Sequence, residues 1–235
     1  MDAAASKAAY VRSMFGRIVP RYDLVNRLMT LGQDVRWRRL AAQLVKPRGA
    51  LALDVGSGTA DLALELAKLG ARSVIGIDFC APMMAAAQGK LARRRGGRRV
   101  SLAAADAMAL PFADRSFGCV VNGFVLRNVA DLKATLIELC RVLEPGGRLA
   151  CLELTHAPAQ IETLFGFYFN RMVPRLGALL TGQGDAYQYF SRSLDGFPDA
   201  DGLAALIAHA GFVNVSYIRL GFGTIAIHLG EKPRR

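Results

Sequence analysis

The feature that most constrains the fold is a glycine-rich turn directly after a short apolar run. The run Leu51–Val55 has the length and composition of a buried strand. Glycines in the turn that follows let the backbone approach a ligand closely while the chain enters a helix. A strand, a glycine turn and a helix in this order predict a nucleotide-type site, to which Asp54, Gly56 and Gly58 would contribute.

The rest of the chain alternates between strand-like and helix-like segments. Strands are predicted at 51–55, 73–77, 99–104, 118–124 and 148–154, with helices at 59–69, 82–95 and 132–143, the last closed by Glu-Pro-Gly-Gly. Two further strands, 213–220 and 224–229, flank a Gly-Phe-Gly turn and read as a hairpin. This order predicts an α/β fold with helices on both faces of a mostly parallel, seven-stranded sheet and a C-terminal antiparallel hairpin.

Acidic residues follow the second and third predicted strands. Asp78 lies 20 residues after Gly58, where a nucleotide site needs an acceptor for ribose hydroxyls. Asp106 follows the third strand, where a carboxylate can accept the exocyclic amine of adenine. Asp61 stands where a dinucleotide motif has its third glycine, which argues against NAD. The acids suit S-adenosylmethionine, a cationic ligand without a pyrophosphate; the alternative is that each acid caps a helix or turn.

Length and charge narrow the class further. The 235 residues fit one α/β domain, within which residues 1–48 are expected to form a helical lid over a cofactor-binding domain at 49–235, with an inserted apolar segment at 161–200. The net charge of +11 indicates a solvated basic surface, an anionic membrane or nucleic acid. Because no aromatic-interleaved RNA motif accompanies the charge, we expect no nucleic-acid partner.

Cysteine and histidine usage points to an intracellular enzyme without a metal. The four cysteines have no Cys-x-x-Cys spacing, which favours reduced thiols in the cytoplasm. The three histidines are scattered, so we expect no metal site. The first ten residues lack the apolar core of a secretory signal, and no apolar run approaches the roughly 20 residues of a membrane span.

Several segments resemble the ubiquinone/menaquinone biosynthesis C-methyltransferase family. They are Tyr22–Asn26 with its continuation to Trp37, Phe124–Asn128, Arg141–Leu149 with its continuation to Thr155, and Tyr187–Leu194. The resemblance runs from about residue 11 to residue 233. Generic small-molecule methyltransferases share the glycine turn but lack these segments.

The resemblance implies a class I methyltransferase with a Rossmann-like fold that methylates a ring carbon of a polyprenylated hydroquinone. It implies that S-adenosylmethionine is held at Thr59, Asp78, Asp106 and Ala107, and that Gly123 stands where the family can use a serine. Other departures from the family pattern are Thr30 and Thr155 for serines, Asp34 for a histidine, Glu144 for a lysine and Ala60 for a glycine. Asp34 and Ala60 bear on the shape of the substrate and cofactor edges.

Arg127 and Asn128 are the candidate catalytic residues, because they follow the fourth strand at the expected position of the methyl group. A hydroquinol that loses its phenolic proton places charge on a ring carbon, which can then attack the methyl. Arg127 would stabilise that phenolate, and Asn128 would orient a ring oxygen. The alternative is that Arg127 pairs with a carboxylate such as Asp131 across the turn.

Four further residues are candidates for the substrate site. Tyr22 and Asn26 lie in the polar segment that we expect to fold over the cofactor as a lid. Tyr187 and Tyr189 would line the ring pocket, although plain packing explains them equally well. The apolar and aromatic stretch 164–180 would hold the prenyl tail, rest on lipid, or form the interface of a homodimer.

Three other functions remain open at this stage. Among quinones, demethylmenaquinol is favoured over the 2-polyprenyl-6-methoxy-1,4-benzoquinol precursor of ubiquinone, although the family uses similar residues for both rings. An enzyme that methylates oxygen on another phenolic or lipid acceptor would share the cofactor site. A non-catalytic scaffold is disfavoured because Asp78, Asp106 and Arg127 are all present.

Overall fold

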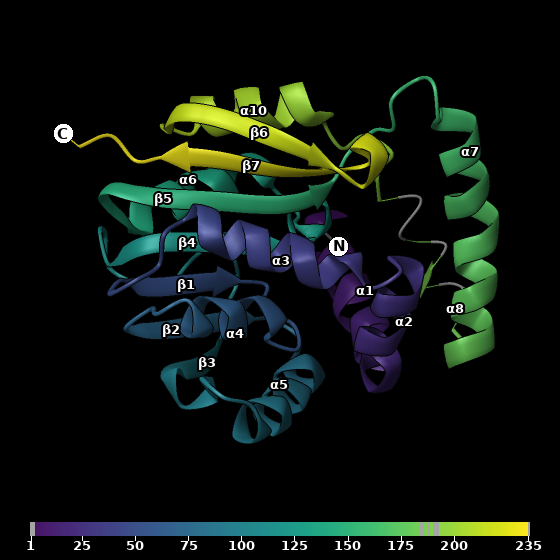
Figure 1. Cartoon of the computed structure of the whole chain (residues 1–235), viewed down its shortest axis with the longest axis horizontal. Helices are drawn as coiled ribbons and strands as arrows, with labels where there is room; N and C mark the ends of the chain where they lie inside the picture. The colour runs from purple at the N-terminus through teal and green to yellow at the C-terminus, as the bar shows by residue number, and fades with distance from the viewer. Residues whose placement is uncertain (1–2, 184–185, 188, 190–192, 235) are drawn as a thin grey trace.

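A seven-stranded sheet organises the chain, with the strand order β3-β2-β1-β4-β5-β7-β6 (Figure 1). The computed structural model describes residues 3–183, 186–187, 189 and 193–234. All neighbouring pairs up to β4·β5 are parallel, whereas β7 pairs antiparallel with both β5 and β6. The predicted α/β fold with a C-terminal hairpin is therefore confirmed. The strands are β1 (Leu51–Val55), β2 (Ser73–Asp78), β3 (Val100–Ala104), β4 (Phe117–Gly123), β5 (Leu143–Leu154), β6 (Val213–Leu220) and β7 (Ile225–Glu231).

The central strands are apolar on both faces, which is why helices cover both sides of the sheet. Successive residues of a strand point to opposite faces. In β1, Ala52 joins one hydrophobic cluster and Leu53 the other, and in β4, Val120 and Val121 divide in the same way. Every one of these four side chains is fully buried. The sheet therefore separates two cores.

The helices divide between these cores. Helices α3 (Gln33–Leu44), α4 (Asp61–Lys68) and α5 (Ala81–Arg93) supply the first cluster. Helices α6 (Leu132–Val142) and α10 (Ala200–His209) supply the second. At the carboxyl edge of the parallel strands stand α1 (Ala3–Ile18) and α2 (Tyr22–Met29), next to the column formed by α7 (Glu162–Phe167), the π-helical turn η4 (Tyr168–Met172) and α8 (Val173–Thr181) (Figure 1).

One boundary prediction was wrong. The sequence pattern placed Glu-Pro-Gly-Gly outside any strand, but β5 begins at Leu143, directly after α6. Leu143 pairs with Phe117 of β4, and the register then shifts so that Cys119 pairs with Arg148. The intervening glycines exchange backbone hydrogen bonds with Lys232, 2.9 Å from the Gly146 amide to the Lys232 carbonyl and 2.9 Å from the Lys232 amide to the Gly147 carbonyl. The backbone of Lys232, directly after β7, thus satisfies polar groups that the sequence alone assigned to a loop.

No helix among the described residues is long and apolar enough to cross a membrane. The inserted segment instead forms the short helices α7 and α8 around η4, and part of it lies outside the described residues.

Two residues of α6 offer a matched test of the second core. Leu139 is fully buried, whereas Ile137 on the same helix is 56% exposed. We expect Leu139→Ala to lower the free energy of unfolding by about 2–5 kcal/mol, because a cavity remains where the side chain packed. Ile137→Ala should change it by less than about 1 kcal/mol. Urea denaturation of both variants measures the difference, and equal effects would contradict the assignment of this core.

Candidate active site

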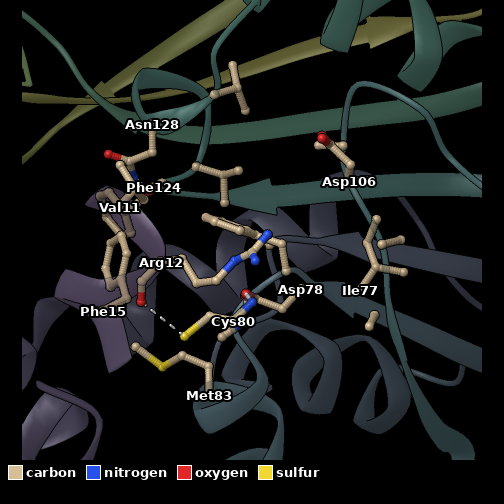
Figure 2. A pocket seen from close by; sticks show the side chains of 18 of the residues that line it. Val11, Arg12, Phe15, Ile77, Asp78, Cys80, Met83, Asp106, Phe124 and Asn128 are labelled. Atoms are coloured by element: carbon tan, nitrogen blue, oxygen red, sulfur yellow. Dashed lines mark hydrogen bonds between the residues drawn. The ribbon is translucent and has the colours of Figure 1, made fainter. Parts of the chain in front are cut away.

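A cavity of about 360 Å³ lies at the carboxyl edge of the sheet, beyond β1, β2, β3 and β4. Figure 2 shows the side chains of Asp78 and Cys80 at the end of β2, Asp106 beyond β3, and Val11, Arg12 and Phe15 facing them from α1. Parallel strands end at the same edge, which is where open α/β sheets bind ligands. Of the predicted cofactor residues, those that line this cavity are Gly56, Gly58, Asp78, Asp106, Ala107 and Gly123.

The first glycine turn brings bare backbone to the cavity wall. Gly56 has a φ of +66°, a conformation that residues with a Cβ rarely adopt. A Cβ placed there would meet a Cγ of Val125 at 2.3 Å. Only glycine fits between this turn and the loop after β4, so the two loops close one side of the cavity together.

Asp78 is anchored by the turns on either side of it. One carboxylate oxygen accepts the Gly58 amide at 2.8 Å and the other accepts the Cys80 amide at 2.8 Å. Burial raises the pKa of Asp78, and these amides act in the opposite direction. Each oxygen has a further lone pair, so the carboxylate can accept hydroxyl groups from a ligand in the cavity.

Asp106 and Asn128 stand at the far sides of the same cavity. One carboxylate oxygen of Asp106 accepts the Met108 amide at 2.9 Å, which orders the loop that contains Ala107. The Asn128 amide donates to the Phe124 carbonyl at 3.0 Å. Its own Oδ1 is buried and accepts no hydrogen bond from the described residues. An unpartnered buried acceptor beside a cavity is suited to a ligand donor.

The N-terminal helices cover this cavity. Arg12 of α1 lies over the Phe79 ring, 5.4 Å from its centroid, and its carbonyl accepts the Cys80 thiol at 3.7 Å (Figure 2). At α2, Asp23 accepts the Thr59 hydroxyl at 2.6 Å and pairs with Lys90 of α5 at 2.5 Å. These contacts tie the covering helices to the glycine turn and to α5.

Two predicted cofactor residues lie just behind the cavity wall. Asp54 is buried, with one oxygen accepting the Ser57 hydroxyl at 2.9 Å and the Ala63 amide at 3.0 Å. Thr59 bonds to Asp23 and Lys90 instead of facing the cavity. Ala60, where the family usually has glycine, adopts a left-handed φ of +67° at the start of α4. The structure therefore places these three residues where they shape the turn.

A second, larger cavity of about 740 Å³ adjoins the first. Its walls come mainly from apolar residues of α2, α3, α7, η4 and the turn between β6 and β7. Tyr22 and Phe124 line both cavities, so the two meet at these side chains. Asn26 and Arg127 line the second cavity only.

A buried ion pair stands at this junction. Arg127 bonds to the carboxylate of Glu153, and its Nε donates to the Ser193 hydroxyl at 3.0 Å. Glu153 is fully buried, and its second oxygen accepts no hydrogen bond from the described residues. Burial raises the pKa of Glu153, and Arg127 opposes that shift. Arg127 does pair with a carboxylate, as the alternative expected, but the partner is Glu153; Asp131, the example named, instead caps α6 by accepting the Ala134 amide at 3.0 Å.

Phe124 sits between two cations at the same junction. Arg38 and Arg127 lie over its ring, at 5.4 Å and 5.8 Å from the centroid. Arg38 is held by Asp34 at 2.6 Å, and the same oxygen of Asp34 accepts from Arg27 at 2.5 Å. The family departure at position 34 therefore provides a buried carboxylate that orders two arginines beside the second cavity.

The two remaining predicted residues do not line either cavity. Tyr187 is buried against Gly177 of α8, and Tyr189 packs on Tyr10 with ring centroids 5.6 Å apart. The other residues of Tyr187–Leu194 lie partly outside the described residues. Sequence reasoning missed Arg38, Phe124, Lys90 and Glu153 as individual residues. Of these, Phe124 and Glu153 lie in family segments, which was the one available signal.

The fold is that of the class I methyltransferases, with the first cavity at the carboxyl ends of the parallel strands. A Thermotoga maritima protein described as a SAM-dependent methyltransferase superposes with a TM-score of 0.67 at 18% identity, covering 94% of this chain and 98% of that one. At this identity the likeness shows the fold alone.

The chain belongs to the ubiE/COQ5 methyltransferase family, whose pattern it matches over residues 3–232. A Thermus thermophilus protein named demethylmenaquinone methyltransferase is 44% identical, over 94% of this chain and all of the relative. A Desulfotalea psychrophila protein named ubiquinone/menaquinone biosynthesis C-methyltransferase UbiE is 42% identical, over 97% of this chain and 92% of the relative.

Asp54 supplies a test of the turn behind the cofactor cavity. Burial raises the pKa of Asp54 to about 7, so its folded-state pKa exceeds its unfolded one. The wild-type chain should therefore lose stability from this group as the pH rises from about 4 to 7, on the order of 2 kcal/mol, and Asp54→Asn should remove that loss. Urea denaturation at pH 5 and pH 8 measures the effect. Asp114→Asn is the control: Arg141 lowers the pKa of Asp114, so this carboxyl stays ionised across the measured range and its replacement should leave the pH dependence unchanged.

Proposed function

We propose that this protein transfers a methyl group from S-adenosylmethionine to a ring carbon of a polyprenylated hydroquinone, with demethylmenaquinol as substrate and menaquinol as product. The observation that carries the proposal is that the cavity at the strand ends, which contains Asp78 and Asp106, meets a larger apolar cavity at Tyr22 and Phe124. Relatives named demethylmenaquinone methyltransferase support the choice of quinone.

The first cavity fits S-adenosylmethionine. The Asp78 carboxylate, fixed by two amides, accepts the ribose hydroxyls. Asp106 and the backbone at Ala107 hold the adenine, and the bare backbone of Gly56 and Gly58 leaves room for the amino-acid portion. Residues 1–48 act as a lid, since Val11, Phe15 and Tyr22 close this cavity from α1 and α2.

The cofactor supplies the electrophilic methyl group, and the protein's residues prepare the nucleophile. Loss of a phenolic proton raises the electron density on the neighbouring ring carbon. Arg127 stabilises the resulting phenolate, and the unpartnered Oδ1 of Asn128 accepts a hydrogen bond from the ring hydroxyl that keeps its proton. As the carbon–carbon bond forms, the donor leaves as S-adenosylhomocysteine. The ring carbon then loses its proton, aromaticity returns and the phenolate oxygen regains a proton, so the net release is one proton per turnover.

The second cavity receives the ring and the first part of the prenyl tail. The volume of this cavity is about 740 Å³. Small-molecule sites typically have volumes of about 300–1,000 Å³. Tyr22, Asn26 and Arg127 supply polar groups at the junction, and the aromatic residues of α7 and η4 supply the apolar wall. A longer tail extends beyond the cavity.

We place the enzyme at the cytoplasmic face of an anionic membrane. Its substrate is dissolved in lipid, and the net charge of +11 favours an anionic surface. The four cysteines carry free thiols, which suits a reducing compartment.

Product analysis tests the proposed function. We expect the purified enzyme, given demethylmenaquinol and methyl-labelled S-adenosylmethionine, to yield menaquinol with the label on a ring carbon, read by mass spectrometry. Parallel reactions contain 2-polyprenyl-6-methoxy-1,4-benzoquinol, and a demethylating treatment separates carbon from oxygen products. Label that the treatment removes, or faster turnover of the benzoquinol, would overturn the assignment. Calorimetric titration with S-adenosylmethionine tests the cofactor site separately.

Glu153 is proposed as the residue that positions Arg127. We expect Glu153→Gln to lower kcat by about 10- to 100-fold, because the guanidinium is no longer held over the junction. Removing the negative charge leaves the site more positive, so the acidic limb of the pH–rate profile should move to lower pH. Glu153→Asp keeps the charge and should lower kcat without moving that limb. Arg127→Ala with wild-type turnover would contradict the role of the pair.

A further inference from the structure

The two most exposed large apolar side chains in the described part of the chain occupy the tips of two turns. Leu31, between α2 and α3, is 87% exposed, and Phe222, between β6 and β7, is 88% exposed. Both have left-handed backbones, with φ of +51° and +57°. Bulky residues rarely adopt this conformation, because the Cβ crowds the backbone. Each tip therefore combines an exposed apolar side chain with backbone strain. Asparagine or glycine at these positions would remove the apolar side chain and relieve the strain.

The two tips line the same cavity. Leu31 and Phe222 both line the second cavity, together with the exposed side chains of Leu164, Phe167 and Met172 on α7 and η4. These five residues, here called the rim, come from three separate parts of the chain. Figure 1 shows the β6–β7 turn at the end of the molecule where α7 and α8 stand. The water-facing surface of a protein seldom carries this many apolar side chains around the opening of a cavity.

We propose that the rim inserts into an anionic phospholipid bilayer, with Leu31 and Phe222 entering the acyl region and the second cavity opening directly to lipid. This inference rests on the proposed function for its purpose, since a polyprenyl tail could then pass from bilayer to cavity without crossing water. The burial of several apolar side chains in the interface, combined with electrostatic attraction, is the usual basis of peripheral membrane binding.

Charge on the same elements is complementary to such a surface. Arg171 of η4 and Arg175 of α8 are exposed, and Glu162 is the only carboxylate on α7, η4 and α8. Arg36 of α3 is exposed five residues after the Leu31 tip. Arg219 of β6 is exposed beside the other tip, where it donates to the Gly223 carbonyl at 3.1 Å. No ion pair is recorded for these four arginines within the described residues, so anionic headgroups can bind them.

The experiment exploits the strained backbone of the tips. In Leu31→Asn and Phe222→Asn the new residue tolerates the left-handed conformation, so thermal unfolding should stay at the wild-type temperature or rise. Flotation with vesicles of phosphatidylcholine containing phosphatidylglycerol should recover the wild-type chain. Each substitution should weaken that binding about tenfold, and the double variant should stay at the bottom of the gradient. The control Ile137→Asn, at an exposed site on α6, should float like the wild type.

A second measurement reports insertion directly. The wild-type chain has a single tryptophan, the buried Trp37, as its reference signal. In Phe222→Trp, added vesicles should shift the emission to shorter wavelength, and brominated lipids should quench the new component. Omitting phosphatidylglycerol or raising the salt concentration should weaken binding, because Arg171 and Arg175 act through charge.

Three outcomes would overturn the proposal. The first is that the wild-type chain is absent from the floated fraction, and the second is that the double variant floats as well as the wild type. The third is that sedimentation shows a wild-type dimer that the double variant loses, which would assign the rim to a contact with a second copy. None of these readouts uses the quinone. Intact flotation without methyl transfer would therefore reject the proposed function alone, and methyl transfer without flotation would reject the rim alone.

Discussion

The site depends on parallel pairing of β1 with both of its neighbours, β2 and β4. Because the three strands run in one direction, their carboxyl ends, and the loops that follow, meet at one edge. The Gly56 turn, the Asp78 carboxylate and the loop at Phe124 are distant in sequence but adjacent in space for this reason alone. The apolar residues that bury both faces of these strands therefore also hold the polar groups of the cofactor cavity in position.

Under the proposed function, cofactor and substrate meet at the junction between the two cavities. Phe124 separates them and carries an arginine near its ring from each of two elements, α3 and the loop after β4. Asp34, in the wall of the second cavity, and the fully buried Glu153 pair with these arginines. Carboxylates buried in this way cost solvation energy, which their paired cations offset. The arrangement leaves guanidinium groups fixed where a phenolate would develop, so little reorganisation accompanies charge formation.

The N-terminal helices and the inserted column form the outer half of the molecule. Helix α1 closes the first cavity, while α7 and η4 close the second, and Tyr22 at the start of α2 lines both. These elements contain most of the exposed apolar side chains, in contrast to the sheet, whose central strands are buried.

Local pattern in the sequence determined the strands, the glycine turn and the acids that follow successive strands. Asp78 and Asp106 could be placed at the site because hydrophobic runs end just before them and parallel strands share an edge. Arg127 and Asn128 were predicted in the same way, because they follow the fourth strand. Each of these predictions uses residues that are neighbours along the chain or that belong to a regular repeat.

Only the tertiary structure decided which side chains bond to one another. Arg127 pairs with Glu153 and not with Asp131 because β5 lies beside β4, a contact that no local pattern reports. Asp54 and Thr59 turned behind the cavity wall because Ser57, Asp23 and Lys90 bond to them there. The meeting of Leu31 with Phe222 at one cavity joins residues almost two hundred positions apart. Such contacts depend on how packed elements approach in space, which a sequence period does not encode.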